Sequence, residues 1–561
     1  MTRARLLEAA AVIVGALLLA VLTTWPLALS LDDRAHDQYD TLSQAWTIDW
    51  VQHSLASADP LWDANIFHDS PRSLAYTDSL IGPALVLLPA RWLGLSPIGV
   101  LNVGLLLAYA SSAAAGYVFG KAVTRRAAVA VVVGVVFAFG TSNTFLAQHF
   151  NIALHPGPAL AAAAVWLLAD RRSEGQRVAP TLVALALVVA LQGSASFNTA
   201  AITLLAAVAA ALGRWRDLGL RGLGLAAGAS AAGLAALLPL AWPYFENSRS
   251  SGALSHGLRD FGTTGASFTT VDPSLWLWGD ALATPTGLFG RQPVFPGVVL
   301  LVLAVYGLLL WGRAADRRAH VFAVTFVLVG LVAAIGTSDR GWRQYAPYRL
   351  VYELMPGGNA LRATGRFWIV GLLGMGLLAG LAVHDLARRL AARASGRAIV
   401  TTAAVVGVAV GGILIEGHRS WTNLPKVAVP AVDQALATIG NSDDGGGGVL
   451  YLPVPTSGAL LDVLPQAAVI YGTTAHHRRT PNGYSGYFPD SFYALDERVG
   501  GLPDDASLGF LRRLSVRYVV VPEAAGSWQY LRRPAAAAPL VLVGEYDGAL
   551  LYELPDARPL R

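Results

Sequence analysis

Apolar runs of about 18–20 residues, the length of a membrane-spanning helix, recur along most of this 561-residue chain. No other feature constrains the fold as strongly, because a run of that length can cross the hydrocarbon core of a bilayer. Eleven such windows can be placed, near residues 7–29, 97–119, 127–145, 152–169, 178–193, 196–212, 220–243, 294–311, 319–336, 366–386 and 397–416. The pattern predicts a mainly α-helical, polytopic membrane protein with about eleven transmembrane helices.

Basic residues gather in the links that follow every second window: Lys121/Arg125/Arg126, Arg171/Arg172/Arg177, Arg214/Arg216/Arg221, Arg313/Arg317/Arg318 and Arg388/Arg389/Arg393/Arg397. The positive-inside rule places these links and the N-terminus in the cytoplasm, and an odd number of spans then places the C-terminus outside. The apolar segment 79–95 is left out of the count, because a further span would reverse every later loop. We expect it to be a re-entrant or interfacial helix on the outer side. The first window is longer than a usual signal-peptide core, so we expect an uncleaved helix.

The predicted topology divides the chain into two parts. Residues 1–416 form the membrane domain, with outer loops at 30–96, 246–293 and 337–365. Residues 417–561 read as a soluble extracytoplasmic α/β domain, with strand-like runs at 448–455, 516–523, 539–548 and 549–555 and helical pieces at 490–499 and 506–514.

Composition excludes several classes of protein. Without any cysteine there is no disulfide, no thiolate nucleophile and no cysteine metal site. The net charge is +5, but the basic residues are scattered in twos and threes between apolar blocks, so we expect no binding of nucleic acid. A phosphate-cradling glycine loop, a Gly-x-Ser-x-Gly elbow and a His-Glu-x-x-His motif are all absent from the sequence, which argues against a cytosolic nucleotide-driven enzyme.

The first outer loop is acidic, with many aspartates between residues 30 and 78 against Arg34 and Arg72. A single aspartate in such a loop is ordinarily a solvated surface residue. Asp37 and Asp40 differ because they lie among aromatic residues such as Trp46, and tryptophan favours the membrane interface. Partial desolvation there would raise the pKa of a carboxylate toward the range of a general base.

Four segments carry a resemblance to a known family: YDTLSQAWTIDWVQHSL (39–55), ADPLWDANIFHDSPRSLAYTDSLIGPAL (58–85), PYRLVYELMPGGNALRATGRF (347–367) and TPNGYSGYFPDSFYALDERV (480–499). Together they resemble an uncharacterised bacterial branch of the GT-C superfamily of polyprenyl-phosphate-sugar-dependent membrane glycosyltransferases. In that superfamily an acidic residue of the first outer loop is the presumed catalytic base. Its spacing from Trp46 makes Asp40 the matching position and Asp37 the second choice. The branch usually has Gly-Asp-Pro there, where this chain has Tyr39-Asp40-Thr41.

The resemblance implies a function at the outer face of the plasma membrane. A sugar would pass from a polyprenyl-phosphate carrier to an envelope glycan, lipid or protein, by an inverting mechanism that uses a general base. A lipid phosphate is a leaving group that cations stabilise. The candidates for contact with the lipid phosphate or the donor are Arg343, Arg349, Arg362, Arg366 and His53. The alternatives are that Arg366 anchors a helix at the interface and that Arg349 pairs with Glu353 one turn later.

The loop 482–489 is rich in glycine and tyrosine, and aromatic faces suit both sugar rings and domain packing. Asn482, Tyr484 and Tyr487 are therefore candidates for acceptor binding or for packing of the outer domain, and we favour packing. The adjacent His476 and His477 lack the third ligand of a metal site, so we expect no metal there. A divalent cation held by the first-loop aspartates is the alternative, although that loop has no Asp-x-Asp pair.

Two further functions stay open. A transporter or flippase of lipid-linked glycans would keep ionisable residues inside its spans, whereas the spans here hold very few charges. A non-catalytic protein of envelope assembly is the third reading. We rank the glycosyltransferase first.

Overall fold

The computed structural model describes residues 3–57, 59–251, 263–282, 293–313, 317–337, 341–354, 358, 361, 363–393, 397–439, 447–457 and 460–555. These residues form two compact units. The first unit consists of Met1–Ser30, Val103–Pro239 and His256–Asn423. The second consists of Leu31–Asn102, Leu240–Ser255 and Leu424–Arg561.

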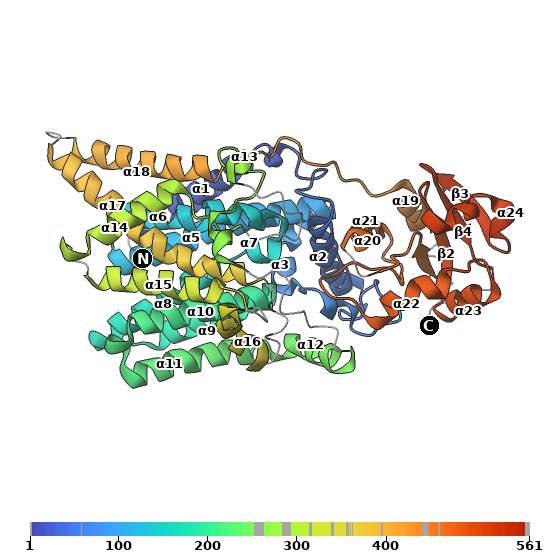
Figure 1. Ribbon diagram of the computed structural model, residues 1–561, viewed down its shortest axis with the longest axis horizontal. Coiled ribbons are helices and arrows are strands. Elements are labelled where there is room, and N and C mark those ends of the chain that lie inside the picture. Colours follow the sequence, from blue (N-terminus) through green and yellow to red (C-terminus); the bar gives the residue numbers. More distant parts are fainter. Residues whose placement is uncertain are drawn as a thin grey trace. The chain divides into compact units, whose positions relative to one another are not determined.

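The first unit is a bundle of apolar helices that run side by side (Figure 1). Its long elements are α1 (Arg3–Thr23), α5 (Pro97–Thr124), α6 (Ala127–Phe139), α8 (Pro156–Ser173), α9 (Ala179–Ala195), α10 (Phe197–Gly213), α11 (Trp215–Ala235), α14 (Val298–Leu309), α15 (Arg317–Ala334), α17 (Trp368–Arg393) and α18 (Ala398–Glu416). Each of the eleven predicted windows coincides with one of these helices. Among the described residues, seven helices are long and apolar enough to cross a membrane and four more are apolar but shorter. How many of them cross stays a prediction.

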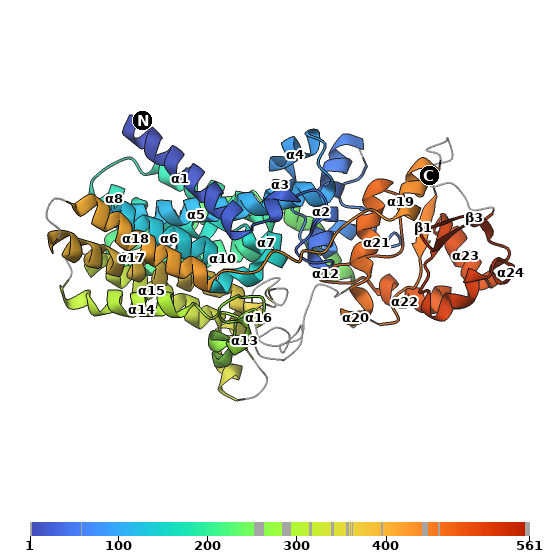
Figure 2. The same ribbon diagram turned by 90° about the horizontal axis from the view of Figure 1, so that it is seen from above.

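Helix α17 is the centre of this bundle. It packs against α6, α14, α15 and α18, and the view from above shows it among its neighbours (Figure 2). Glycines allow the backbones to approach closely: an added Cβ on Gly307 of α14 would lie 2.0 Å from the Leu378 carbonyl oxygen, and one on Gly330 of α15 would lie 2.3 Å from the Gly371 nitrogen. Small residues at helix crossings are typical of bundles that pack inside a membrane.

Shorter elements connect the helices of the first unit. They are η3 (Thr141–Gln148), α7 (Phe150–Ala153), η4 (Gly265–Thr269), α13 (Gly279–Leu282), η6 (Trp342–Tyr345), α16 (Tyr348–Leu354) and η8 (Thr364–Phe367). Of these, η3 and η8 supply side chains to a pocket described below.

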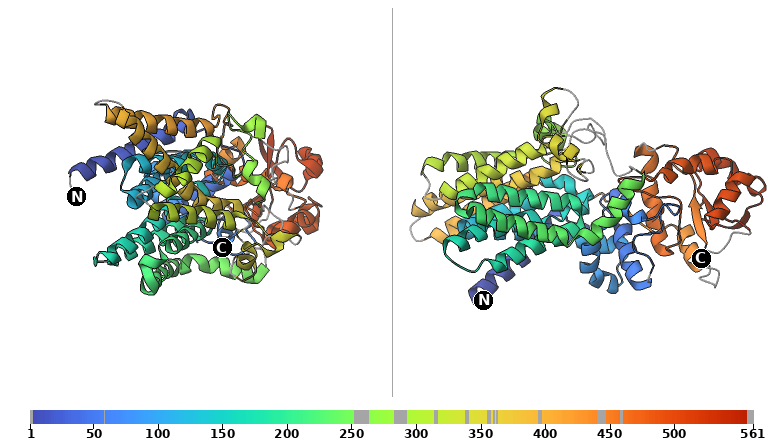
Figure 3. Two further views of the ribbon diagram at one scale, coloured as in Figure 1. Left: turned by 60° about the vertical axis from the view of Figure 1, so that its left-hand side comes forward. Right: turned by 90° about the horizontal axis from the view of Figure 1, so that it is seen from below.

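The second unit contains a four-stranded sheet of β1 (Gly448–Tyr451), β2 (Val516–Val521), β4 (Ala549–Glu553) and β3 (Val541–Tyr546), in that spatial order. Strands β1 and β2 are parallel and the other pairs are antiparallel. The helices α22 (Asp490–Val499) and α23 (Asp505–Arg513) cover one face through Leu495, Leu508 and Leu511. Helix α19 (Ala431–Thr438) packs against alternate strand residues such as Val449 and Leu551. All four predicted strands and both predicted helices are confirmed, and further views of the sheet appear in Figure 3.

The first outer loop belongs to this same second unit. It forms α2 (Asp40–Ser57), η2 (Ser73–Tyr76), α3 (Ile81–Val86) and α4 (Leu88–Trp92). Backbone hydrogen bonds join it to the C-terminal segment: Phe67 N donates to Asn482 O at 3.0 Å, His68 N to Thr480 O at 3.0 Å and Thr480 N to Asn65 O at 2.7 Å. The compact units therefore differ from the sequence-based division at residue 417, which assigned this loop to the membrane domain.

The segment 79–95 is two short helices, α3 and α4, instead of the single helix expected. Proline explains the break, because Pro89 at the start of α4 cannot donate a backbone hydrogen bond to the preceding turn. Val86 and Trp92 on these helices are exposed, and so is Leu93 directly after α4. Their place at the membrane interface stays a prediction.

Candidate active site

The Asp37 carboxylate accepts the hydrogen bonds of the turn in which helix α2 begins. Its Oδ1 accepts hydrogen bonds from the backbone N–H groups of Tyr39 (2.7 Å) and Thr41 (3.3 Å), and its Oδ2 accepts one from the Thr41 hydroxyl at 2.5 Å. The first N–H groups of a helix have no partner inside the helix, and an aspartate just before it supplies one. Asp37 therefore holds the turn from which α2 begins.

Asp40 is the first residue of α2, and its carboxylate meets a side chain from the other end of the chain. The hydroxyl of Tyr484 donates a hydrogen bond to its Oδ1 at 2.8 Å. Tyr484 is buried, with 5% of its surface exposed. The N-terminal end of a helix favours a negative charge, and a base must carry that charge in order to accept a proton.

The segment that presents Tyr484 is fixed by Asn482, which has no exposed surface. The Asn482 amide exchanges two hydrogen bonds of 2.9 Å with the backbone N–H and carbonyl of Tyr451, and its Nδ2 also donates to Gln466 at 3.0 Å. At Gly483 an added Cβ would lie 2.2 Å from the ring of Phe67, so only glycine lets the chain pass there. This environment favours packing over acceptor binding as the role of Asn482.

Tyr487, the third candidate of this loop, is partly exposed. Its backbone nitrogen lies 3.5 Å from the Ser485 hydroxyl, and the Ser485 hydroxyl in turn donates to the carbonyl of Tyr76. The backbone around Tyr487 thus contributes to the contact between the loop and the first-loop segment.

His53, a candidate for donor contact, lies on α2 and belongs to a cluster of ionisable side chains from several segments. Its Nε2 lies 2.9 Å from Oδ2 of Asp59, and its ring stacks on that of His477 with a centroid separation of 3.7 Å and an interplanar angle of 6°. The Nε2 of His477 lies 2.7 Å from Oδ2 of Asp49, and the other carboxylate oxygen of Asp49, Oδ1, accepts a hydrogen bond from Arg91. Burial, and then the charge of His477, lower the pKa of His53.

Sequence reasoning missed this cluster, although one signal was present. Asp49 and His53 are four residues apart and therefore share a face of α2. The partner His477 lies on a segment 428 positions further along than Asp49, and no local pattern could supply it.

The neighbouring His476 is fully enclosed. Its Nδ1 accepts from the backbone N–H of Arg478 at 3.0 Å, while its Nε2 lies 3.3 Å from Oδ1 of Asp433 and 3.0 Å from the Tyr451 hydroxyl. Burial lowers the pKa of His476, which favours the neutral ring. In the part of the chain that the structure describes, no three histidine, aspartate or glutamate side chains gather in a way that could hold a metal ion.

The four candidate arginines belong to the first unit or lie outside the described residues. Arg349 pairs with Glu353 at 2.7 Å, which is the alternative that the spacing of four residues offered. Arg343 is in η6, where its backbone carbonyl accepts from the Thr337 hydroxyl at 3.0 Å. Arg362 lies outside the described residues.

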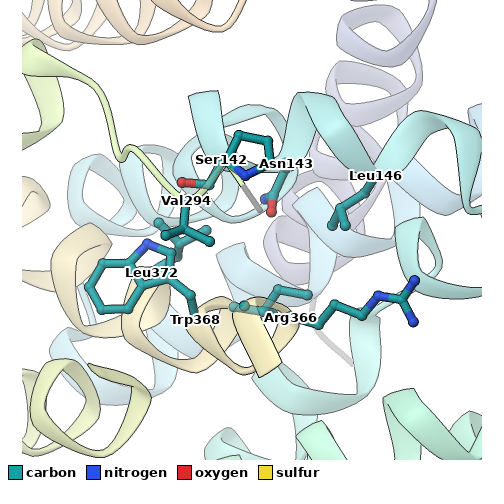
Figure 4. A pocket seen from close by; sticks show the side chains of 10 residues that line it. Ser142, Asn143, Leu146, Val294, Arg366, Trp368 and Leu372 are labelled. Carbon is teal, nitrogen blue, oxygen red and sulfur yellow. The ribbon is translucent and has the colours of Figure 1, made fainter. Parts of the chain in front are cut away.

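Arg366 is in η8, directly before α17, and it lines a small pocket together with Asn143 and Trp368 (Figure 4). Figure 4 shows its guanidinium on the opposite side of the pocket from the Trp368 indole. Arg366 is thus a predicted phosphate contact that lines a pocket.

No protein-family model matches the chain, and no curated protein matches it. Among solved structures, the arabinofuranosyltransferase AftD from Mycobacteria matches 99% of this chain at 16% identity with a TM-score of 0.58. AftD is a GT-C glycosyltransferase. The chain has the GT-C fold.

The chain spans 42% of the length of AftD. Two other solved structures are similar at lower scores. The oligosaccharyltransferase AglB from Archaeoglobus fulgidus, in complex with an inhibitory peptide and a dolichol-phosphate, matches at 11% identity over 93% of this chain and 70% of that chain, with a TM-score of 0.49. ArnT from Cupriavidus metallidurans, in the apo state, matches at 14% identity over 98% of both chains, with a TM-score of 0.47.

Proposed function

We propose that this GT-C chain transfers a sugar from a polyprenyl-phosphate carrier to an envelope acceptor at the outer face of the membrane. The observation that supports it best is the Asp40 carboxylate, which lies at the start of α2 and is held by the Tyr484 hydroxyl. The Asp37 carboxylate already accepts hydrogen bonds from Tyr39 and Thr41 at the start of the helix, so Asp40 is the better candidate for the base.

The proposed reaction inverts the configuration at the anomeric carbon. The acceptor hydroxyl oxygen forms a bond to that carbon while its proton passes to the Asp40 carboxylate. The bond from the anomeric carbon to the phosphate oxygen breaks, and its electron pair leaves with the lipid phosphate. A leaving phosphate is stabilised by positive charge.

The charges of the first unit favour an enzyme over a transporter. Arg214 pairs with Asp170 in the last turn of α8 (2.8 Å) and with Asp217 in the first turn of α11 (2.6 Å). Transporters place ionisable residues near the middle of their spans. The charges of Arg214, Asp170 and Asp217 instead pair at helix ends, where they hold neighbouring helices together and do not line a path for a substrate.

We propose the topology that the arginine clusters predict, with the N-terminus in the cytoplasm and the C-terminal segment outside. Reporter fusions after residue 430 test this proposal. An active extracytoplasmic reporter there agrees with it, and an active cytoplasmic reporter contradicts it.

The function is tested by analysing lipid-linked sugars and envelope glycans in a deletion strain that carries wild type, Asp40→Asn or Asp33→Asn. Losing a positioned base lowers a rate by about 10²–10⁴, so Asp40→Asn should accumulate the donor and lose the product at normal protein levels. Asp33→Asn, in the same acidic loop, is the matched control and should behave as wild type. Near-normal transfer by Asp40→Asn would contradict the assignment of the base.

A further inference from the structure

The pocket beside Arg366 contains two buried polar atoms that have no hydrogen-bond partner in the described part of the chain. They are Oδ1 of Asn143 and Nε1 of Trp368. Asn143 is 1% exposed and Trp368 is 4% exposed. Buried donors and acceptors are almost always paired in folded proteins, because an unpaired one loses its hydrogen bonds to water and gains nothing. Two in one pocket indicate a missing partner.

Neighbouring contacts fix the orientation of both groups. Nδ2 of Asn143 donates to the carbonyl of Phe137 at 2.5 Å, so the amide oxygen must face the other way, and Figure 4 shows it pointing into the pocket. The Trp368 ring packs edge-on against Phe268, with a centroid separation of 5.1 Å and an interplanar angle of 88°. The hydroxyl of Ser142, also in the pocket, already donates to the carbonyl of Phe295 at 2.9 Å. One acceptor and one donor are therefore left for a ligand.

A hydroxyl group matches this pair, because it donates one hydrogen bond to the Asn143 oxygen and accepts one from the Trp368 N–H. A phosphate diester has no proton to donate to Asn143. The pocket has a volume of about 20 Å³, which suits one group of the size of a hydroxyl. Arg366 lines the same pocket, and a guanidinium favours a phosphate close to that hydroxyl.

We propose that this pocket binds one sugar hydroxyl of a glycosyl phosphate, with Asn143 and Trp368 holding the hydroxyl and Arg366 facing the phosphate. The choice of a glycosyl phosphate rests on the proposed function. The pairing of a hydroxyl with Asn143 and Trp368 rests on the two unpartnered atoms.

The test uses the full-length chain in lipid nanodiscs and two probes, farnesyl phosphate and farnesyl phosphate linked to a pentose or a hexose. Calorimetry compares wild type with Trp368→Phe, which keeps an aromatic ring against Phe268 and removes only the N–H and the second ring. Trp276→Phe makes the same chemical change at an exposed position and is the matched control.

Losing one hydrogen bond to the ligand should weaken binding of the sugar-bearing probe about fivefold. Binding of farnesyl phosphate alone should not change, and Trp276→Phe should bind both probes as wild type does.

Three outcomes overturn the proposal. In the first, Trp368→Phe binds both probes more weakly by the same factor. In the second, it binds both probes as wild type does. In the third, the wild-type chain binds the sugar-bearing probe no better than farnesyl phosphate. Unchanged binding of both probes means that the pocket holds a water molecule only. Asp40→Asn separates this result from the function, since it should lose transfer and still bind the sugar-bearing probe. If Asp40→Asn keeps transfer while Trp368→Phe loses binding, the assigned base is wrong and the pocket stands.

Discussion

The hydroxyl of Tyr484 donates a 2.8 Å hydrogen bond to Oδ1 of Asp40, although the two residues are 444 positions apart in the chain. The candidate base at the start of α2 is therefore positioned by the C-terminal segment. Tyr484 touches Asp40 and does not itself accept the proton in the proposed reaction, so it is a positioning residue.

Tyr484→Phe should lower transfer about tenfold, because it removes one donor that stabilises the ionised Asp40 carboxylate. The acid side of the rate profile should also move to higher pH, since a carboxylate with one hydrogen bond fewer takes up a proton more readily. Rates measured across pH in membranes check both effects. Tyr487→Phe, in the same loop, is the control and should leave the profile in place. An unchanged profile for Tyr484→Phe would remove its positioning role.

Asp37→Ala should destabilise the fold and spare the chemistry. The variant loses the contacts to Tyr39 and Thr41 that hold the first turn of α2, and losing such a cap costs about 1 kcal/mol. Thermal unfolding should show a lower Tm, while transfer per folded molecule stays within a few-fold of wild type. Complete loss of transfer at an unchanged Tm would make Asp37 the base in place of Asp40.

The stacked pair of His53 and His477 should make the second unit less stable in acid. Burial and the charge of His477 place the pKa of His53 below the ordinary histidine value of 6.5. As the pH falls through about 6.5, the unfolded chain takes up a proton before the folded chain does, so the free energy of unfolding decreases. Asp49 and Asp59, which face the pair, reduce the effect without reversing its direction.

His53→Phe keeps a ring to stack on His477 and removes the titration. The protection of α2 against hydrogen exchange should then fall less between about pH 7.5 and about pH 5 than in wild type, after correction for intrinsic rates. His418→Phe, a change at an exposed histidine, should follow wild type. Other buried histidines of the unit titrate in the same direction, and burial with the charge of Arg479 lowers the pKa of His68 to about 4. Some acid sensitivity should therefore persist, and an identical response from His53→Phe contradicts the prediction.

Gly483→Ala should separate the first loop from the C-terminal segment. The added methyl would lie 2.2 Å from the Phe67 ring, and that ring is fully buried. Overpacking of this kind costs about 1–3 kcal/mol. Limited proteolysis should cut the first loop faster than in wild type. Gly411→Ala, where no atom lies within 4 Å of the new Cβ, is the control. Wild-type resistance in Gly483→Ala would show that the segments do not depend on this contact.

Local patterns in the sequence predicted the elements well. An apolar run of sufficient length is a helix wherever it lies, and alternating β-branched residues such as Val519 and Val521 mark a strand without knowledge of its neighbours. The pair of Arg349 and Glu353 also followed from spacing alone. Asp37 precedes the first helical residue of α2 by a short turn, so its capping role was readable too.

Contacts between distant segments could not be predicted in this way. The backbone of Phe67 pairs with that of Asn482, and the ring of His53 stacks on that of His477, and no period or spacing links the members of either pair. The boundary at residue 417 was drawn from hydropathy, which carries no information on such contacts, and it stays a prediction. Trp368 and Asn143 were missed as pocket residues because both read as ordinary members of an apolar helix or its end.

The backbone hydrogen bonds between the first loop, at Asn65, Phe67 and His68, and the segment of Thr480 and Asn482 also set an order of events during synthesis. When a ribosome has completed the first loop, it has yet to make most of the helices and all of the segment that the loop pairs with. Phe67 and the other loop side chains that are buried in the folded protein therefore stay exposed until nearly the whole polypeptide has been translated. A nascent chain arrested before residue 480 should consequently depend on a holding chaperone.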